Sequence, residues 1–393
     1  MALDKNGKKL PKGITQRADG LYMGRFQYEG EIYPPIYDKD VKVVEKKLND
    51  LRYEVTHQIY SAKSKVTLDE WFAIWMTDYR GIRIKEGTKT VYRDTYNARI
   101  KPVLGKKRLT SIRMEQIQKL YNDLAAKGYA EGSIKQVAVV LYGMFKQAEK
   151  SGIVTRNVAA MATIPKAKAK KERVALSLEE QRLFEKHIEA YSPHYRLYLL
   201  ALSTGLRNGE VRGLTWNDID FEERIIRVTG TLKYVKGKGT YRDTPKTKTS
   251  KRDIPMLGYC YKLLKEERQR QEEAKELAGT FWNPLPGLEN LVFTHTDGRP
   301  ISRETVSREL GHVITAIRAD GEEIPEFTFH TLRHTFATRG LEQGIPLKAM
   351  QAILGHTTLA MTSDLYSHVL PGTKAKEMAK LEEIFKTDCE TKE

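Results

Sequence analysis

Apolar side chains in the first 60 residues alternate as in β-strands and then follow the longer period of a helix. Residues 21–28 place aromatic side chains at even positions, which predicts a strand. Residues 29–31 predict a turn, and residues 32–37 a return strand that two prolines shorten. Asp40 is placed to begin a helix. Its apolar stripe is Val43, Val44, Leu48, Leu51 and Val55. Residues 1–62 are therefore expected to form a small sheet backed by one helix, either a binding domain or an extension without a binding role.

Helical periodicity replaces this pattern from residue 63 onward. Thr67 and Glu70 have the three-residue spacing of a capping box, and an apolar run through Trp71 and Trp75 follows them. Further helical patterns lie near residues 88–101, 112–127 and 131–150. Glycines separate them, at Gly87, Gly105, Gly128 and Gly152. The pattern predicts an all-α domain over residues 63–165.

The clearest boundary is the basic segment of residues 166–173. It alternates small and basic side chains without apolar periodicity, which predicts an extended, solvated linker. The domain before it carries many more Lys and Arg than Asp and Glu. We therefore favour a linker that crosses a DNA backbone, and a plain charged linker is the alternative.

Residues 174–393 predict a mainly helical domain with a small antiparallel sheet. Ser177 and Glu180 form a second capping-box pattern, and strand-like residues 225–228 and 252–255 flank a segment rich in Gly, Lys and Thr. Helical patterns return after about residue 300. The whole chain is thus expected to be a multidomain α+β protein. Beyond Pro371 and Gly372, an amphipathic stripe predicts a tail helix over residues 373–387, which packs either on its own domain or on a neighbouring protomer.

The net charge of +16 is concentrated in one part of the chain. Residues 61–172 carry 23 Lys and Arg against 10 Asp and Glu, whereas the counts are 11 against 9 before them and 33 against 32 after them. Such a concentrated excess favours a surface that binds phosphates, although a basic surface without a ligand is the alternative. Cys260 and Cys389 match no metal or redox spacing, and no apolar run of about 18 residues marks a membrane span. A cytoplasmic protein is expected.

Three separated clusters in the last domain carry unusual chemistry. The first pairs Arg207 with Glu210 three residues later, which could hold the guanidinium in place. In the second, His330 and Arg333 share one face of a helix. The third has His356 in a Leu-Gly-His sequence and Tyr366 ten residues further on.

A metal site at His330 and His334 is the alternative interpretation of the second cluster. Zinc proteases of that spacing need a Glu directly after the first His, and Thr331 stands there instead. Arg333 would also repel a dication. We therefore expect no metal here and regard His334 as a structural neighbour.

Taken together, the three clusters resemble the tyrosine recombinase (phage integrase) family. Its signatures run Thr-Gly-x-Arg-x-x-Glu, His-x-x-Arg-His, and Leu-Gly-His followed by a Tyr, and all three occur in this order within residues 174–370. The resemblance implies that Arg207, His330, Arg333 and His356 are catalytic and that Tyr366 is the nucleophile. It also implies a catalytic lysine in a β-hairpin, for which we take Lys246, with Lys248 and Lys251 as competitors.

The chemistry of these residue types fits DNA cleavage without a cofactor. Two arginines can hold the non-bridging oxygens of a phosphodiester and stay charged, so no metal ion is required. A histidine, assigned here to His330, can help the Tyr366 phenol lose its proton, because a phenol has an ordinary pKa of about 10. Lys246 can protonate the leaving 5′ oxygen. A phosphotyrosine would conserve the energy of the broken ester, so rejoining needs no ATP.

Within the family, the N-terminal sheet unit resembles the arm-binding domain of conjugative-transposon integrases. The resemblance implies double-stranded DNA partners of core and arm type, a homotetramer on synapsed DNA, possible help from an excisionase and DNA-bending proteins, and no membrane partner. Three alternatives stay open: a chromosome-dimer-resolving recombinase, a type IB topoisomerase-like enzyme, and a DNA-binding regulator with an inert catalytic fold.

Overall fold

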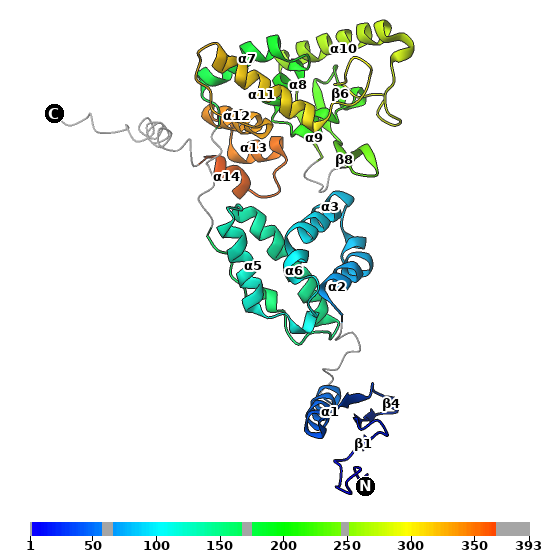
Figure 1. Ribbon diagram of the computed structural model, residues 1–393. Helices are drawn as coiled ribbons and strands as arrows, with labels where there is room; N and C mark the ends of the chain where they lie inside the picture. Colours follow the sequence, from blue (N-terminus) through cyan, green and yellow to red (C-terminus); the bar gives the residue numbers. More distant parts are fainter. Residues whose placement is uncertain (1, 57–65, 167–174, 245–250, 367–393) are drawn as a thin grey trace, which may run out of the picture. The chain divides into compact units, whose positions relative to one another are not determined.

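The computed structural model describes residues 2–56, 66–166, 175–244 and 251–366. The chain divides into two compact units, Met1–Lys170 and Lys171–Glu393 (Figure 1). Residues 167–173 of the expected linker and the expected tail helix over residues 373–387 lie outside the described residues. In the described parts of the chain, no helix is both long enough and apolar enough to cross a membrane.

The chain begins with two small antiparallel sheets and one helix. The strands are β1 (Ile14–Gln16), β2 (Tyr22–Gly24), β3 (Gln27–Tyr28), β4 (Glu31–Ile32) and β5 (Ile36–Asp38). Strands β1, β2 and β5 form one sheet in that order, and β3 and β4 form a separate hairpin. Ile14, Val44 and Leu48 form the core between the sheet and α1 (Val41–Thr56), which confirms the expected sheet-and-helix arrangement.

Two details of this sheet differ from the sequence prediction. The single strand expected over residues 21–28 is divided between β2 and β3, which belong to different sheets, and β1 was not expected. A Cβ atom on Gly24 would lie 3.0 Å from a methyl carbon of Val44, so the end of β2 packs directly on α1. Glu29 and Gly30 both have positive φ and form the tight turn between β3 and β4.

The second part of this unit is the expected helical region. Its helical segments are α2 (Leu68–Ile74), η2 (Trp75–Tyr79), η3 (Gly81–Arg83), α3 (Glu86–Thr95), η4 (Tyr96–Ile100), α4 (Lys101–Leu104), η5 (Leu109–Ser111), α5 (Met114–Ala126), α6 (Glu131–Lys150) and η6 (Val158–Ala160). Thr67 and Glu70 form the expected capping box at the start of α2. Gly87 does not separate two helices, because it lies in the first turn of α3. Trp71, Tyr121 and Phe145 belong to a core distinct from that of the N-terminal sheet.

The second unit consists mainly of helices. They are α7 (Leu178–Tyr191), α8 (Tyr195–Thr204), α9 (Asn208–Arg212), α10 (Gly258–Ala278), α11 (Arg303–Ala319), α12 (Phe329–Glu342), α13 (Leu347–Leu354) and α14 (Ala360–Tyr366). The capping box of Ser177 and Glu180 is confirmed at the start of α7. Helix α10 was not expected, because most of its positions are charged or polar and it buries only one narrow stripe.

The expected small sheet is present in this unit. Strands β6 (Ile219–Asp220), β7 (Ile225–Val228) and β10 (Arg252–Pro255) form an antiparallel sheet in the order β10-β7-β6, with Ile254 opposite Ile226. Between β7 and β10, strands β8 (Thr231–Val235) and β9 (Gly239–Asp243) pair as a hairpin. Helices α12, α13 and α14 contact one another (orange in Figure 1). The expected residues His330, Arg333 and His356 lie on or directly after these helices.

Candidate active site

Arg207 is positioned by the sharp turn that joins α8 to α9. Gly205 ends α8 in a left-handed conformation with φ of 66°, and a Cβ atom there would lie 2.6 Å from the Phe336 ring. Arg207 is the residue that precedes α9, and its Nη1 donates to Glu210 Oε1 at 2.7 Å. Its backbone N–H donates to the other carboxylate oxygen of Glu210 at 3.0 Å. The three-residue spacing thus brings the two side chains into contact.

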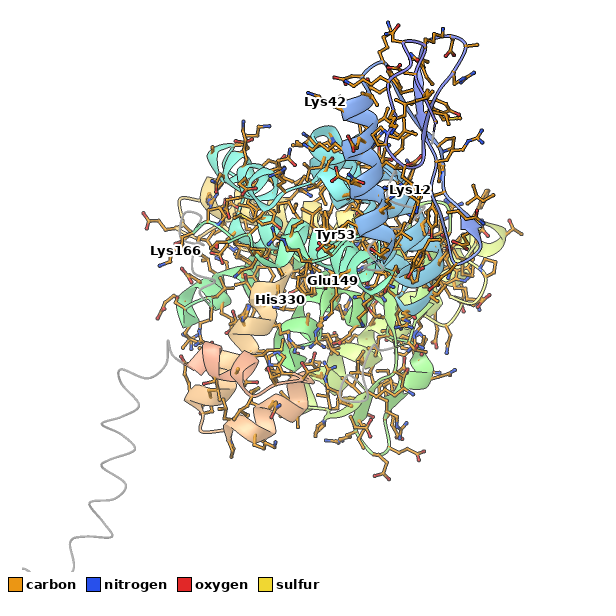
Figure 2. All side chains as sticks on the ribbon, turned by 90° about the horizontal axis from the view of Figure 1, so that it is seen from below. Lys12, Lys42, Tyr53, Glu149, Lys166 and His330 are labelled. Atoms are coloured by element: carbon orange, nitrogen blue, oxygen red, sulfur yellow. The ribbon has the colours of Figure 1, made fainter. Side chains whose placement is uncertain are left out.

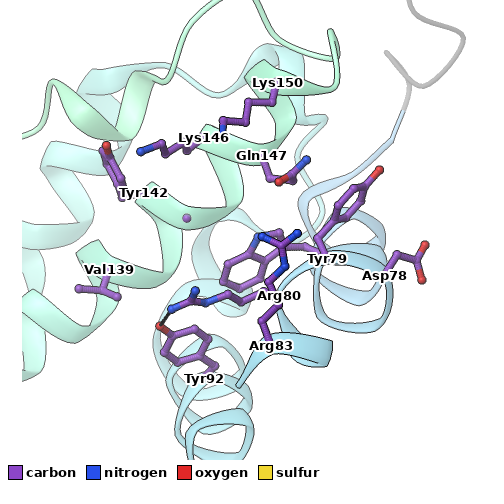
Figure 3. Close-up of a pocket in the computed structure, with 12 residues that line it drawn as sticks. Asp78, Tyr79, Arg80, Arg83, Tyr92, Val139, Tyr142, Lys146, Gln147 and Lys150 are labelled. Carbon is purple, nitrogen blue, oxygen red and sulfur yellow. Dashed lines mark hydrogen bonds between the residues drawn. The ribbon is translucent and has the colours of Figure 1, made fainter. Parts of the chain in front are cut away.

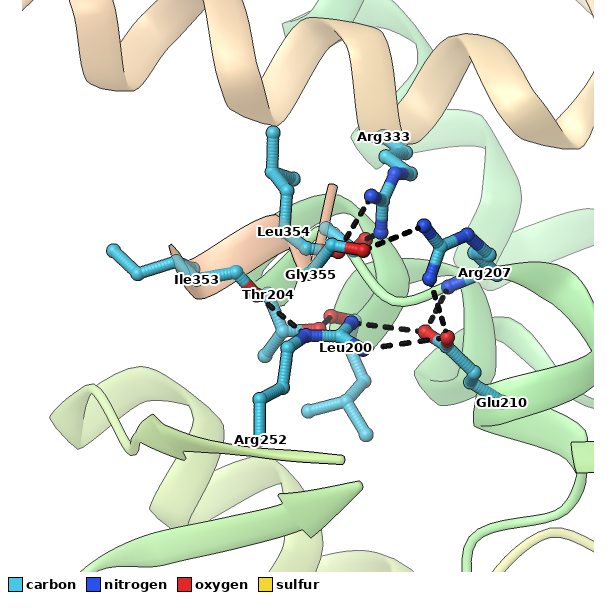
Figure 4. A network of polar contacts seen from close by, with 10 residues as sticks. Leu200, Thr204, Arg207, Glu210, Arg252, Arg333, Ile353, Leu354 and Gly355 are labelled. Atoms are coloured by element: carbon cyan, nitrogen blue, oxygen red, sulfur yellow. Dashed lines mark hydrogen bonds and ion pairs between the residues drawn. The ribbon is translucent and has the colours of Figure 1, made fainter. Parts of the chain in front are cut away.

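Arg333 lies on α12 and is almost completely buried. Its guanidinium donates to the carbonyl oxygen of Gly205 at 2.7 Å and to that of Leu354 at 2.6 Å. Arg207 reaches the same turn, where its Nη2 donates to the carbonyl oxygen of Gly355 at 3.2 Å. Two arginines distant in sequence are therefore held side by side at the end of α13 (Figure 4).

A third arginine, Arg252 on β10, joins this network and was not expected from the sequence. Its Nε donates to the carbonyl oxygen of Ile353 at 2.5 Å, and its Nη2 donates to Glu210 Oε2 at 2.9 Å (Figure 4). The last carbonyls of a helix lack partners within the helix and carry partial negative charge. The carbonyls of residues 353, 354 and 355 each accept from a different arginine, so the end of α13 organises all three guanidinium groups.

Burial and charge set the protonation states in this network. Burial disfavours the charged form of Glu210, but hydrogen bonding and charge from Arg252, and then charge from Arg207, lower its pKa to about 2. Burial, together with the charges of Arg207 and Arg252, lowers the pKa of Arg333 to about 9. At neutral pH, one carboxylate therefore stands among three guanidinium cations.

His356 directly follows Gly355 and is nearly buried. Its Nδ1 lies 2.9 Å from the hydroxyl oxygen of Thr362, a buried residue of α14. Burial lowers the pKa of His356 to about 4, and the nearby charge of Arg333 and Arg207 acts in the same direction. The imidazole is therefore neutral at neutral pH. When the Thr362 hydroxyl donates to Nδ1, Nε2 carries the proton and can act as a hydrogen-bond donor.

His330, labelled in Figure 2, lies in the first turn of α12. Its side chain is exposed. Its ring lies edge-on to that of His334, with centroids 4.6 Å apart, as the four-residue spacing on a helix requires. Throughout the described residues, no three His, Cys, Asp or Glu side chains converge in the way a protein-ligated metal ion would need.

The structure describes only part of the expected lysine segment and only the backbone of the expected nucleophile. Lys246 and Lys248 fall outside the described residues, and Lys251 is exposed just before β10. Tyr366 is the last residue of α14, and its side chain also lies outside the described part. Helix α14 itself contacts α12 and α13, the helices next to the arginine network.

The helical part of the first unit carries a groove of about 330 Å³ lined by basic and aromatic side chains (Figure 3). Arg80 lies in it with its Nη2 3.4 Å from the Tyr92 hydroxyl, and the ammonium of Lys146 lies 5.4 Å from the centre of the Tyr142 ring. Arg83 and Lys150 complete its basic lining. Four cations around one groove match the local excess of positive charge.

Two family models match the chain. The model described as "Phage integrase family" matches residues 173–372, and the one described as "Phage integrase, N-terminal SAM-like domain" matches residues 67–125. The first includes the whole arginine network and the second begins at the capping box of α2.

Individual relatives match over nearly the full length. A "Tyrosine recombinase XerC-like" protein of Caldanaerobacter subterraneus subsp. tengcongensis is 31% identical, over 97% of this chain and 98% of its own. The "Transposase from transposon Tn916" of Enterococcus faecalis is 27% identical, over 96% of both chains.

Solved structures of integrases also resemble this chain. The Tn1549 transposon integrase in complex with transposon right end DNA has a TM-score of 0.70 and 26% identity, and the match covers 80% of this chain and 99% of that one. A lambda integrase dimer bound to a COC′ core site shares the fold, with a TM-score of 0.55 and 23% identity over 91% of this chain and 95% of that one.

Proposed function

The chain belongs to the phage integrase family, the tyrosine recombinases, and from this premise we propose that it integrates and excises a mobile genetic element. It is a site-specific recombinase, an enzyme that breaks and rejoins DNA. The observation behind the proposed DNA cleavage is that the guanidinium groups of Arg207 and Arg333 stand side by side at the end of α13, where they could bind a phosphate. The Tn916 and Tn1549 relatives support a role in moving a transposon.

The two arginines bind the scissile phosphate in this proposal. The transition state of phosphoryl transfer gathers negative charge on the non-bridging oxygens, and fixed guanidinium groups stabilise that charge without rearranging. Both side chains are held by main-chain carbonyls before DNA arrives. The neutral imidazole of His356 adds a hydrogen-bond donor from Nε2 to the same phosphate.

The remaining steps move protons and exchange one ester for another. The Tyr366 phenol loses its proton with help from His330, its oxygen bonds to phosphorus, and the bond from phosphorus to the 5′ oxygen breaks. Lys246 donates a proton to that leaving oxygen. A 3′-phosphotyrosine and a 5′ hydroxyl result, and attack by a 5′ hydroxyl reverses the step, so no ATP is consumed.

DNA is the substrate and the main partner. The basic groove of the first unit, with Arg80, Arg83, Lys146 and Lys150, would grip phosphates of a core-type site, while residues 1–62 would bind an arm-type site. Residues 63–165 act as the core-binding domain and residues 174–393 as the catalytic domain. The solved lambda integrase tetramer bound to a Holliday junction supports a tetramer of this chain on synapsed DNA. An excisionase and bending proteins would assist at the bacterial nucleoid.

Covalent trapping tests the proposal. The protein is incubated in EDTA with nicked DNA carrying its element ends, so that the cleaved strand diffuses away and religation fails. We expect a covalent protein–DNA adduct from the wild type and none from Tyr366→Phe, which should still bind the DNA. Dependence of the adduct on added Mg²⁺ would contradict the proposed chemistry.

Chromosome-dimer resolution is the second candidate, favoured by the XerC-like relative. That relative covers the N-terminal sheet as well, so the presence of residues 1–62 does not separate the two functions. The DNA substrate does. An integrase should recombine element ends with target DNA, whereas a resolving enzyme should act on paired chromosomal sites.

A further inference from the structure

The chemistry proposed above leaves one charged residue of the network unexplained. The side chain of Arg252 on β10 is only 5% exposed and lies on the same face as the core residue Ile254. A guanidinium at such a position is costly unless it is paired. Its partner Glu210 is the carboxylate that also holds Arg207.

The balance of charge explains why Glu210 needs two arginines. A buried carboxylate paired only with Arg207 would neutralise the cation that has to attract DNA phosphate. In the structure, Arg207 contacts one carboxylate oxygen at 2.7 Å, while Arg252 contacts the other at 2.9 Å and the shared one at 3.3 Å. With Arg252 present, the group of three carries one net positive charge. Without it, the remaining pair would carry none.

The second contact of Arg252 joins two segments that the reaction needs. Its Nε bond to the Ile353 carbonyl connects β10 to the end of α13, next to the carbonyls that hold Arg333 and Arg207. Residues 245–250, which include Lys246, lead directly into β10. The same side chain therefore balances the charge at Arg207 and ties the strand after the lysine segment to the arginine network.

We propose that Arg252 is a positioning residue, which neutralises Glu210 so that the charge of Arg207 remains available to the scissile phosphate. The proposal rests on the proposed function, because it assumes cleavage at this site. In this role Arg252 acts through Glu210 and not on the DNA itself.

A double-mutant cycle tests the proposal. Single-turnover cleavage of the nicked DNA is measured for wild type, Arg252→Met, Glu210→Gln and the double variant. Glutamine keeps an acceptor for Arg207 but removes the charge that Arg252 balances. Arg252→Met should slow cleavage by about 10- to 100-fold in the wild-type background, as expected for loss of a charged hydrogen bond. In the Glu210→Gln background it should slow cleavage by less than about threefold.

A neutral substrate separates charge balance from a merely structural role. In a methylphosphonate, a methyl group replaces one non-bridging oxygen, so the scissile group has no charge to attract. Arg252→Met should lose much less activity on this substrate than on phosphate, and Arg252→Lys, which keeps the charge, should lose less than Arg252→Met on phosphate. Equal losses on both substrates would overturn the proposal.

The proposal can still be tested if the Arg252→Met variant is too unstable to fold. Should Arg252→Met fail to fold, the Glu210→Gln background decides, because the double variant leaves no buried carboxylate with a missing partner. A loss above tenfold on adding Arg252→Met there would contradict the proposal. Absence of an adduct from the wild type itself would count against the proposed function instead.

Discussion

Main-chain carbonyl groups, rather than carboxylates, hold the deepest cation of the site. Arg333 donates to the carbonyls of Gly205 and Leu354, and its side chain is almost inaccessible to solvent. The planar guanidinium makes both bonds at once, which a single ammonium on a flexible stem does not do in the same geometry. Substituting lysine would therefore keep the charge and lose the orientation.

Arg333→Lys should reduce adduct formation by about 100-fold or more, the size expected when a fixed donor to a transition state is lost. DNA affinity should change little, because most contacts are made elsewhere. The measurement is single-turnover cleavage beside fluorescence anisotropy with the same DNA. Arg318→Lys is the matched control, since Arg318 also donates to a main-chain carbonyl, that of Ile324, at 2.9 Å. Cleavage by Arg333→Lys within threefold of the control would contradict the assignment.

His356 makes a pH-dependent contribution to stability whose sign follows from its environment. Burial and neighbouring cations lower its pKa from 6.5 to about 4 in the folded state. Between these two values the unfolded chain binds the proton more readily than the folded one, so acidification favours unfolding. The contribution of His356 is complete above pH 6.5 and falls as the pH approaches 4.

The free energy of unfolding of the wild type minus that of His356→Asn should therefore shrink between pH 7.5 and pH 4.5. Urea titrations of the DNA-free proteins at several pH values measure it. A difference that stays constant or grows on acidification would show that the imidazole is not held neutral.

At the scale of elements, the short helix α13 organises the site. Its C-terminal carbonyls bind Arg252, Arg333 and Arg207, and the turn at Gly355 leads straight to His356. Gly355 has φ of 64°, the left-handed region that an L side chain adopts only at a cost. The geometry of one helix end thus controls three cations and one imidazole.

Gly355→Ala should lower the free energy of unfolding by about 1–2 kcal/mol and should also displace the carbonyls that hold the arginines. Gly321→Ala is the matched control, since Gly321 has φ of 84° and open space where its Cβ would lie, away from the network. We expect similar losses of stability in both, with cleavage impaired only in Gly355→Ala. Equal cleavage by the two variants would show that the helix end does not position the site.

Helices were predicted well from the sequence where a capping box or a clear apolar period marked them. Both capping boxes formed as spaced, and the helix over residues 131–150 was predicted at its true bounds. Helix α10 was missed because it is polar on most sides and buries only a narrow stripe. The strand over residues 21–28 was wrong because Gly24 meets α1, a contact distant in sequence.

The site shows the same division between local and long-range information. The contact between Arg207 and Glu210 follows from spacing along one helix. Arg252 was missed, although a charged residue two positions before buried Ile254 on a strand is a signal that it needs a buried partner. The carbonyl groups of residues 353, 354 and 355 carry no such signal in the sequence, because every residue has a carbonyl group. Only the fold determines which of them accept hydrogen bonds from the arginines.

At the scale of the whole molecule, positive charge and chemistry occupy different parts of the sequence. Residues 61–172 hold the excess of Lys and Arg, whereas the arginine network lies beyond residue 200. Affinity for DNA should therefore depend mainly on the first unit, and cleavage on the second.

Lys146→Gln and Lys150→Gln should each reduce the slope of log affinity against log salt by about 1, because each removes one phosphate contact from the groove. Binding to core-site DNA is followed by anisotropy over a range of salt. Lys262→Gln, an exposed lysine of α10, removes the same charge from the second unit and should leave the slope unchanged. An equal effect of all three would mean that net charge alone governs binding.

In the proposed reaction, Tyr366 at the end of α14 becomes covalently joined to DNA. The most direct measurement is mass spectrometry of the trapped adduct after digestion with protease and nuclease. We expect a nucleotide attached through its 3′ phosphate to the peptide that contains Tyr366. Attachment to any other residue, or through a 5′ phosphate, would contradict it.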